Sequence, residues 1–113
     1  MNKPFFCNYH LILNSSTAKN IDSLMNRITK ALEVLEAPST IQPYHKDLTK
    51  TEVFGYVNLP DIEFDNALMW LLKKFQFQFY SWNINGDFDN QISIQPEKFR
   101  ESGIVFAEFM LSR

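Results

Sequence analysis

Alternating apolar residues near the start of the chain predict a β-strand. Between Phe5 and Leu13 every odd position is apolar or amphipathic, whereas the even positions are mixed. Side chains point alternately to the two faces of a strand, so this segment presents one apolar face that a core must cover. The polar residues 14–17 then predict a loop that leads into a helix.

Two later segments have apolar residues at three- and four-residue spacing, which is typical of amphipathic helices. The first runs from about Asn20 to Glu36 and ends before Pro38, because proline disfavours a helical conformation of the residue that precedes it. The second runs from about Asp61 to Phe75, with acids near its start and lysines near its end, as the helix dipole favours.

Five further runs predict strands. An Asn-Gly pair between two alternating runs favours a two-residue β-turn, so Asn85-Gly86 predicts a hairpin. In that register Phe79 faces Ile92, Phe77 faces Ile94 and Asn83 faces Phe88, and the two phenylalanines and two isoleucines share a buried face. The predicted runs are Thr40 to Tyr44, Glu52 to Leu59, Phe77 to Ile84, Asp87 to Ile94 and Gly103 to Leu111.

The resulting order of elements, β-α-β-β-α-β-β-β, predicts a single α+β domain over residues 1–113. Its first six elements match the ferredoxin-like pattern, with both helices on one face of a mostly antiparallel sheet. A C-terminal hairpin and strand extend that sheet. The other face is expected to carry Phe6, His10, Ile12, Phe54, Tyr56, Tyr80, Trp82 and Ile84.

So many aromatic residues on an uncovered face call for an explanation. Three alternatives remain open from the sequence: the C-terminal strands cover the face, two copies of the chain pack sheet against sheet, or the face binds another molecule.

Composition narrows the chemistry. The chain of 113 residues has a net charge of −2, a pI of about 5.6, three glycines and one cysteine. These numbers exclude glycine-rich phosphate loops, an internal disulfide and multi-cysteine zinc sites. No segment has the pattern of a signal peptide or a membrane span, so we expect a cytoplasmic protein without a cofactor.

The sequence predicts no catalytic group and no metal site. Cys7 and His10 are three residues apart on a strand, so their side chains point to opposite faces, and Cys7 is expected to be a small buried hydrophobe. His10 and His45 lack the spacing of metal ligands. Only the tertiary fold could gather scattered groups such as His10, His45 and Glu52 into a site.

Acidic and aromatic residues point instead to a protein-binding surface. Tyrosine and tryptophan are favoured interface anchors, and carboxylates speed the encounter with a basic partner. The expected group around the hairpin could also be ordinary solvated acids, and the second acidic patch could simply complement a helix dipole. The first group comprises Tyr80, Trp82, Asp87 and Asp89, and the second comprises Asp61, Glu63 and Asp65.

Two resemblances bear on function. The segment 54–59, Phe-Gly-Tyr-Val-Asn-Leu, resembles part of the RNA-recognition-motif signature, which implies RNA stacking on Phe54 and Tyr56. Glu52 and Val53 replace the basic residue and glycine of that signature, and the chain is acidic, so nucleic acid is not the expected partner.

As a whole, the small, acidic, Phe- and Asn-rich, cysteine-poor chain resembles immunity proteins of bacterial polymorphic-toxin and contact-dependent growth-inhibition systems. That resemblance implies a non-enzymatic inhibitor that binds a cognate toxin. An RNA binder and a homodimeric structural or regulatory domain remain the alternatives.

Overall fold

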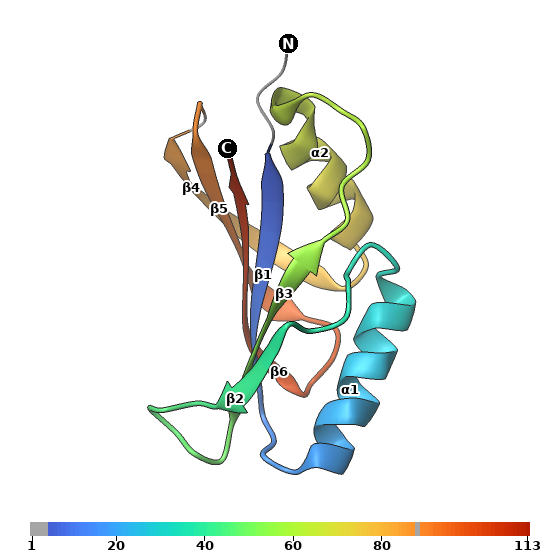
Figure 1. Cartoon of the computed structure of the whole chain (residues 1–113), viewed down its shortest axis with the longest axis vertical. Helices are drawn as coiled ribbons and strands as arrows, with labels where there is room; N and C mark the ends of the chain where they lie inside the picture. The colour runs from blue at the N-terminus through green and yellow to red at the C-terminus, as the bar shows by residue number, and fades with distance from the viewer. Residues whose placement is uncertain (1–4, 88) are drawn as a thin grey trace.

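A computed structural model describes residues 5–87 and 89–113 of the chain. These residues form two helices and six strands, which are labelled in Figure 1. In chain order the elements are β1 (Phe6–Leu13), α1 (Ala18–Ala31), β2 (Thr40–Pro43), β3 (Thr51–Val57), α2 (Phe64–Phe75), β4 (Phe79–Asp87), β5 (Gln91–Phe99) and β6 (Ile104–Ser112).

All six strands form one antiparallel sheet in the order β2-β3-β1-β6-β5-β4. The predicted α+β class and antiparallel sheet are confirmed. The predicted ferredoxin-like pattern is met only in part, because the strand after the second helix does not pair with β1. Strand β6 pairs with β1 instead, and the β4–β5 hairpin lies at the edge of the sheet.

Burial explains why β6 takes the central place. Its residues Ala107, Phe109 and Leu111 are all fully buried, whereas Phe79 is the only buried residue that β4 contributes among its described residues. The strand with the longer apolar face therefore occupies the middle of the sheet, where helices cover it.

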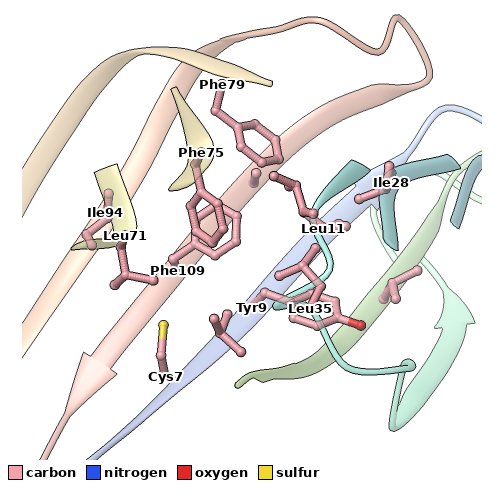
Figure 2. Packing of buried hydrophobic residues seen from close by; sticks show 14 of the residues in the cluster. Cys7, Tyr9, Leu11, Ile28, Leu35, Leu71, Phe75, Phe79, Ile94 and Phe109 are labelled. Atoms are coloured by element: carbon pink, nitrogen blue, oxygen red, sulfur yellow. The ribbon is translucent and has the colours of Figure 1, made fainter. Parts of the chain in front are cut away.

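The core lies between one face of the sheet and both helices, as predicted (Figures 1 and 2). The odd residues of β1, from Cys7 to Leu13, point into it and are buried. The stripe of α1 contributes Ile21, Leu24, Met25 and Ile28, and that of α2 contributes Phe64, Ala67, Leu71 and Phe75.

Helix α1 ends at Ala31, earlier than its apolar stripe predicts. Leu32 and Leu35 are still buried, but Leu35 forms an isolated bridge with Val57 of β3. The N–H of Glu36 donates to the carbonyl of Tyr56 over 2.9 Å. The residues after α1 thus bury their side chains from an extended segment beside β3.

The hairpin turn is not at Asn85-Gly86. Asn85 and Gly86 belong to β4, and because Asp87 pairs with Gln91 the turn lies between these two residues. Asn83 pairs with Gln95 rather than with Phe88, which lies outside the described residues. The side chain of Asp87 stabilises the longer turn, since it accepts hydrogen bonds from the N–H of Asp89 and the side-chain amide of Asn90.

Two other expectations about β4 also change. Phe77 is 67% exposed, because residues 76–78 form the turn between α2 and β4 rather than the start of a strand. Ser81 has a φ of 56°, which interrupts the alternation of side chains. Trp82 therefore points to the helix-covered face and contacts the rings of Phe75 and Phe79.

Candidate partner-binding face

The sheet face away from the helices is its candidate functional surface. We call it the open face, because neither helix packs on it (Figure 1). Strand pairing places on this face the even residues of β1 and β3, the even residues of β6 from Phe106 onward, and the odd residues of β5 up to Gln95. Its central residues are Asn8, His10, Ile12, Glu52, Phe54, Tyr56, Ser93, Gln95, Phe106, Glu108 and Met110.

The strands carry an unbalanced charge. Across all six they contain four carboxylates and a single lysine, Lys98, which lies near the end of β5. The four strands β2, β3, β1 and β6 have no lysine or arginine. The four carboxylates are Glu52, Asp87, Glu97 and Glu108. The open face is acidic, because Glu52 and Glu108 lie at its centre and Asp87 lines the depression beside Ser93.

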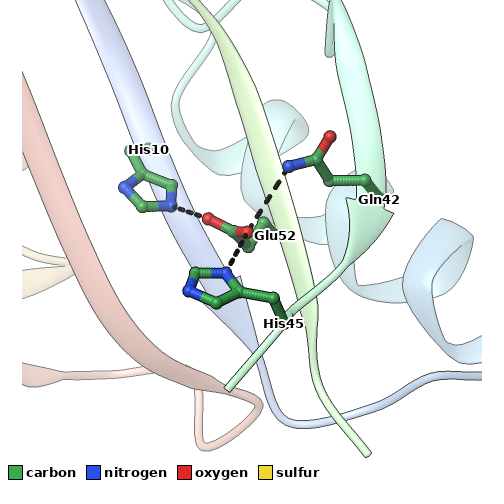
Figure 3. Close-up of polar contacts among 4 residues, drawn as sticks. All are labelled: His10, Gln42, His45 and Glu52. Carbon is green, nitrogen blue, oxygen red and sulfur yellow. Dashed lines mark hydrogen bonds and ion pairs between the residues drawn. The ribbon is translucent and has the colours of Figure 1, made fainter. Parts of the chain in front are cut away.

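Glu52 is the most enclosed of these carboxylates and is only 7% exposed (Figure 3). His10 Nε2 lies 2.9 Å from Oε2, and His45 Nδ1 lies 3.8 Å from Oε1. The side-chain amide of Gln42 also donates to Oε1 over 3.4 Å. The tertiary fold thus gathers His10, His45 and Glu52, which the sequence named as scattered groups only.

An imidazole beside a carboxylate can act as a general base only where a reacting group lies within reach. The single thiol of the chain, on Cys7, points into the core on the other face of the sheet. The two imidazoles and the amide of Gln42 thus supply polar partners to both oxygens of the nearly buried Glu52.

Aromatic rings surround this cluster. The His10 ring stacks on Phe54 with a centroid separation of 4.3 Å and an interplanar angle of 8°, and its edge meets Phe106 at 5.4 Å. Tyr56, two residues beyond Phe54 on the same face, is 50% exposed. The open face therefore combines rings fixed by stacking with one freely accessible tyrosine.

Glu108 forms a second polar group, on the β6 side of His10. Its Oε2 accepts hydrogen bonds from Ser93 Oγ over 2.9 Å and from Gln95 Nε2 over 2.7 Å. A depression of about 220 Å³ begins at its hydrogen-bond partner Ser93, and Met110 and Asp87 also lie in its walls. The sequence offered a signal for this residue, because Glu108 is the only charged residue in an otherwise apolar run.

The structure does not unite the four residues of the predicted acidic-aromatic group. Trp82 packs on the core side, opposite to its predicted face. Tyr80 is 43% exposed, and its hydroxyl donates to the carbonyl of Phe77. Asp87 and Asp89 lie at the hairpin turn, where hydrogen bonds from the Asp89 N–H and the Asn90 amide lower the pKa of Asp87.

The second acidic patch lies at the N-terminal end of α2, away from the open face. Asp61 precedes the helix, Glu63 is its N-cap residue and Asp65 lies in its first turn. Asp65 Oδ1 lies 4.0 Å from Arg113 Nη2, and the Arg113 guanidinium lies over the Phe64 ring. This position matches the dipole complementation that was the alternative interpretation of the patch.

Burial also fixes the state of Cys7. The residue is fully buried, and desolvation raises the pKa of its thiol to about 12. We expect Ellman's reagent at pH 8 to label Cys7 only after unfolding, since the thiolate population falls about a thousandfold relative to a free thiol. Comparing the labelling rate with and without urea measures this; immediate stoichiometric labelling of the folded protein would contradict it.

In residues 5–87 and 89–113, no three His, Cys, Asp or Glu side chains are arranged to hold a metal ion. Nor does any helix of this part have the length and apolar character needed to cross a membrane. Comparisons with protein families, curated proteins and solved structures find no match for the chain.

Proposed function

We propose that this chain is a non-enzymatic protein-binding module that captures a basic partner protein on its open face. The observation that carries the proposal is the composition of that face, where exposed and stacked rings lie among carboxylates on strands without lysine or arginine. Uncovered surfaces of this kind mark interaction sites, and the negative charge favours a positively charged partner.

The most specific form of this proposal is an immunity protein that binds and neutralises a cognate toxin domain. A toxin that acts on nucleic acid needs a basic groove for phosphates. Carboxylates of an inhibitor can occupy such a groove in place of phosphates, and complementary charge accelerates the encounter. The open face has both the carboxylates and the apolar rings that such a contact requires.

We also propose that the fold is a modified ferredoxin-like unit. Strand β6 would take the place of its fourth strand beside β1, and the β4–β5 hairpin would be an insertion after α2. The order β2-β3-β1-β6 supports this interpretation.

The function is tested by co-expression with the toxin domain encoded beside this gene, where one is present. We expect the two proteins to co-purify and the chain to protect cells from the toxin. Tyr56→Ala should weaken the complex by about 30-fold or more, if this half-exposed ring is an interface anchor.

Met69→Ala is the matched control, because Met69 is 62% exposed on α2 at the helix-covered side of the sheet. It should leave the affinity unchanged. Lack of protection and of co-purification would refute the immunity function. Equal effects of Tyr56→Ala and Met69→Ala on the affinity would show that the partner does not bind on the open face.

RNA binding remains the second candidate, because Phe54 and Tyr56 do lie together on the open face. The charge of the open face opposes RNA binding, because Glu52 and Glu108 both lie on it. The strands β2, β3, β1 and β6 also lack lysine and arginine. We expect no binding of single-stranded RNA even at low salt. A gel shift that disappears in Phe54→Ala and Tyr56→Ala would favour the RNA function instead.

Sheet-to-sheet homodimerisation would use the same face. The proposal predicts a monomer in the absence of the partner, which light scattering with size-exclusion chromatography can measure. A dimer that Tyr56→Ala dissociates would favour the homodimer over the basic partner.

A further inference from the structure

We infer that Glu108 is the point on the open face that receives a cationic side chain, an arginine or a lysine, of the partner protein. This inference rests on the proposed function and locates its electrostatic centre at one carboxylate. The predicted acids Asp61, Asp65 and Asp89 would contribute to long-range attraction rather than to this contact.

The two carboxylates at the centre of the face differ in how fully their oxygens are already enclosed and hydrogen-bonded. Glu52 is almost fully buried and has an imidazole beside each of its oxygens. Glu108 is only half-buried, and its two hydrogen-bond donors, Ser93 and Gln95, are both neutral. Glu108 is therefore the carboxylate that is more accessible to a cation of the partner.

The geometry of Glu108 leaves one oxygen free for this contact. Both Ser93 and Gln95 donate to Oε2, and no described residue donates to Oε1. Among the described residues, the only buried side-chain polar atom without a hydrogen-bond partner is Asn8 Oδ1. Oε1 of Glu108 is thus not sealed inside the protein and remains accessible to an incoming donor.

No charged group among the described residues of the neighbouring strands forms an ion pair with Glu108 in place of the partner's side chain. On β1, His10 lies directly opposite Glu108, but its Nε2 is directed at Glu52. On β5, Ser93 and Gln95 are the contacts, and the only lysine of the strands, Lys98, lies opposite Tyr80 of the edge strand β4. No ion pair to Glu108 forms among the described residues.

The surroundings also suit a long cationic side chain. Lysine and arginine bury their apolar stems and keep the charged end at a polar group. The adjoining depression offers Met110 for the stem, Ser93 at the Glu108 side and Asp87 as a second carboxylate. Because Ser93 and Gln95 already hold the carboxylate in place, little ordering remains to be done on binding.

Heteronuclear NMR with a small probe tests the inference without the partner. The probe is N-acetyl-arginine amide, whose only charge is its guanidinium group, and the control ligand is the neutral isostere N-acetyl-citrulline amide. We expect the arginine probe to shift the amide signals of Ser93, Gln95 and Met110 most. Citrulline should leave them unchanged.

Glu108→Gln should weaken the arginine effect by about five- to tenfold, because it removes the charge and keeps the shape. Asp22→Asn, on the exposed side of α1, removes one negative charge elsewhere and should leave the effect intact. Circular dichroism and thermal unfolding establish that each variant is folded. If Glu108→Gln impairs folding, the citrulline comparison on the unmodified chain still decides the case.

Equal binding of arginine and citrulline, an unaltered response in Glu108→Gln, or shifts spread evenly over all surface acids would overturn the inference. These outcomes are distinct from failure of the proposed function. That function fails when no toxin is bound or neutralised, whatever the small probe does; the inference fails when the toxin is bound and Glu108→Gln binds it as tightly as the unmodified chain.

Discussion

Replacing Phe109 by alanine should lower the free energy of unfolding by about 3–5 kcal/mol. The ring is fully buried on β6, and its centroid lies 4.5 Å from that of Phe75 and 5.3 Å from that of Phe79. The ring of Trp82 completes this aromatic cluster, with its centroid 6.4 Å from that of Phe109. Removing Phe109 would leave a cavity bordered by these rings of α2 and β4 and by the paired strands β1 and β5. Rigid neighbours cannot fill it without moving the sheet.

Urea unfolding followed by tryptophan fluorescence measures this loss. Phe77→Ala is the control, because it deletes the same side chain from a position that is 67% exposed. That variant should change stability by no more than about 0.5 kcal/mol. Comparable losses in both variants would mean that the aromatic cluster is not the centre of the core.

Gly55→Ala should cost about 1–3 kcal/mol through overpacking. A Cβ at position 55 would lie 2.3 Å from Cζ of Tyr9, the residue directly opposite on β1. The Tyr9 ring cannot move aside, because it is only 1% exposed and its hydroxyl donates to the carbonyl of Glu36 over 2.8 Å. The glycine is thus required for space rather than for an unusual backbone conformation.

Double-mutant analysis separates this mechanism from a simple loss of strand propensity. Combined with Tyr9→Leu, which removes the ring, Gly55→Ala should cost clearly less than it does alone. Strictly additive effects of the two substitutions on the urea midpoint would show that the clash is not the cause.

Periodicity predicted those parts of the fold whose burial depends on local spacing alone. The odd residues of β1 and the apolar stripes of both helices lie in the core as the pattern indicated. The end of α1 could not be read in this way, because Leu35 continues the stripe but is held by a bridge to Val57 of β3. Val57 is distant in sequence, so the spacing of apolar residues in α1 cannot predict that this bridge ends the helix.

The hairpin shows how a strong local signal can lose to its surroundings. Asn85-Gly86 favours a tight turn, yet Asp87 accepts two hydrogen bonds within the longer turn that follows. The observed register also pairs Phe79 with Phe99 and Ile84 with Ile94, which joins apolar residues along the whole hairpin. The left-handed conformation of Ser81 then turns Trp82 to the opposite face of the sheet. Serine does not favour this conformation, so the sequence could not predict it.

The candidate site was only partly accessible from the sequence. Alternation placed Phe54 and Tyr56 on the face opposite the core, whereas Glu108 was not predicted as a site residue. The contact between His10 and Glu52 joins residues on two strands that are separated by a helix and a further strand. Such a contact depends on strand order and register, which tertiary packing decides.

The geometry of β4 bears on the solubility of the protein at high concentration. A sheet that ends in a long, flat strand can add a strand from another molecule and so start aggregation. One edge here, β2, has four residues and ends with Pro43, which cannot donate a backbone hydrogen bond. At the other edge, Ser81 and Gly86 have φ values of 56° and 128°, so the uninterrupted stretch between them is residues 82–85. Both edge strands are therefore too short to pair stably with a strand of another molecule. This protects the sheet from edge-to-edge aggregation.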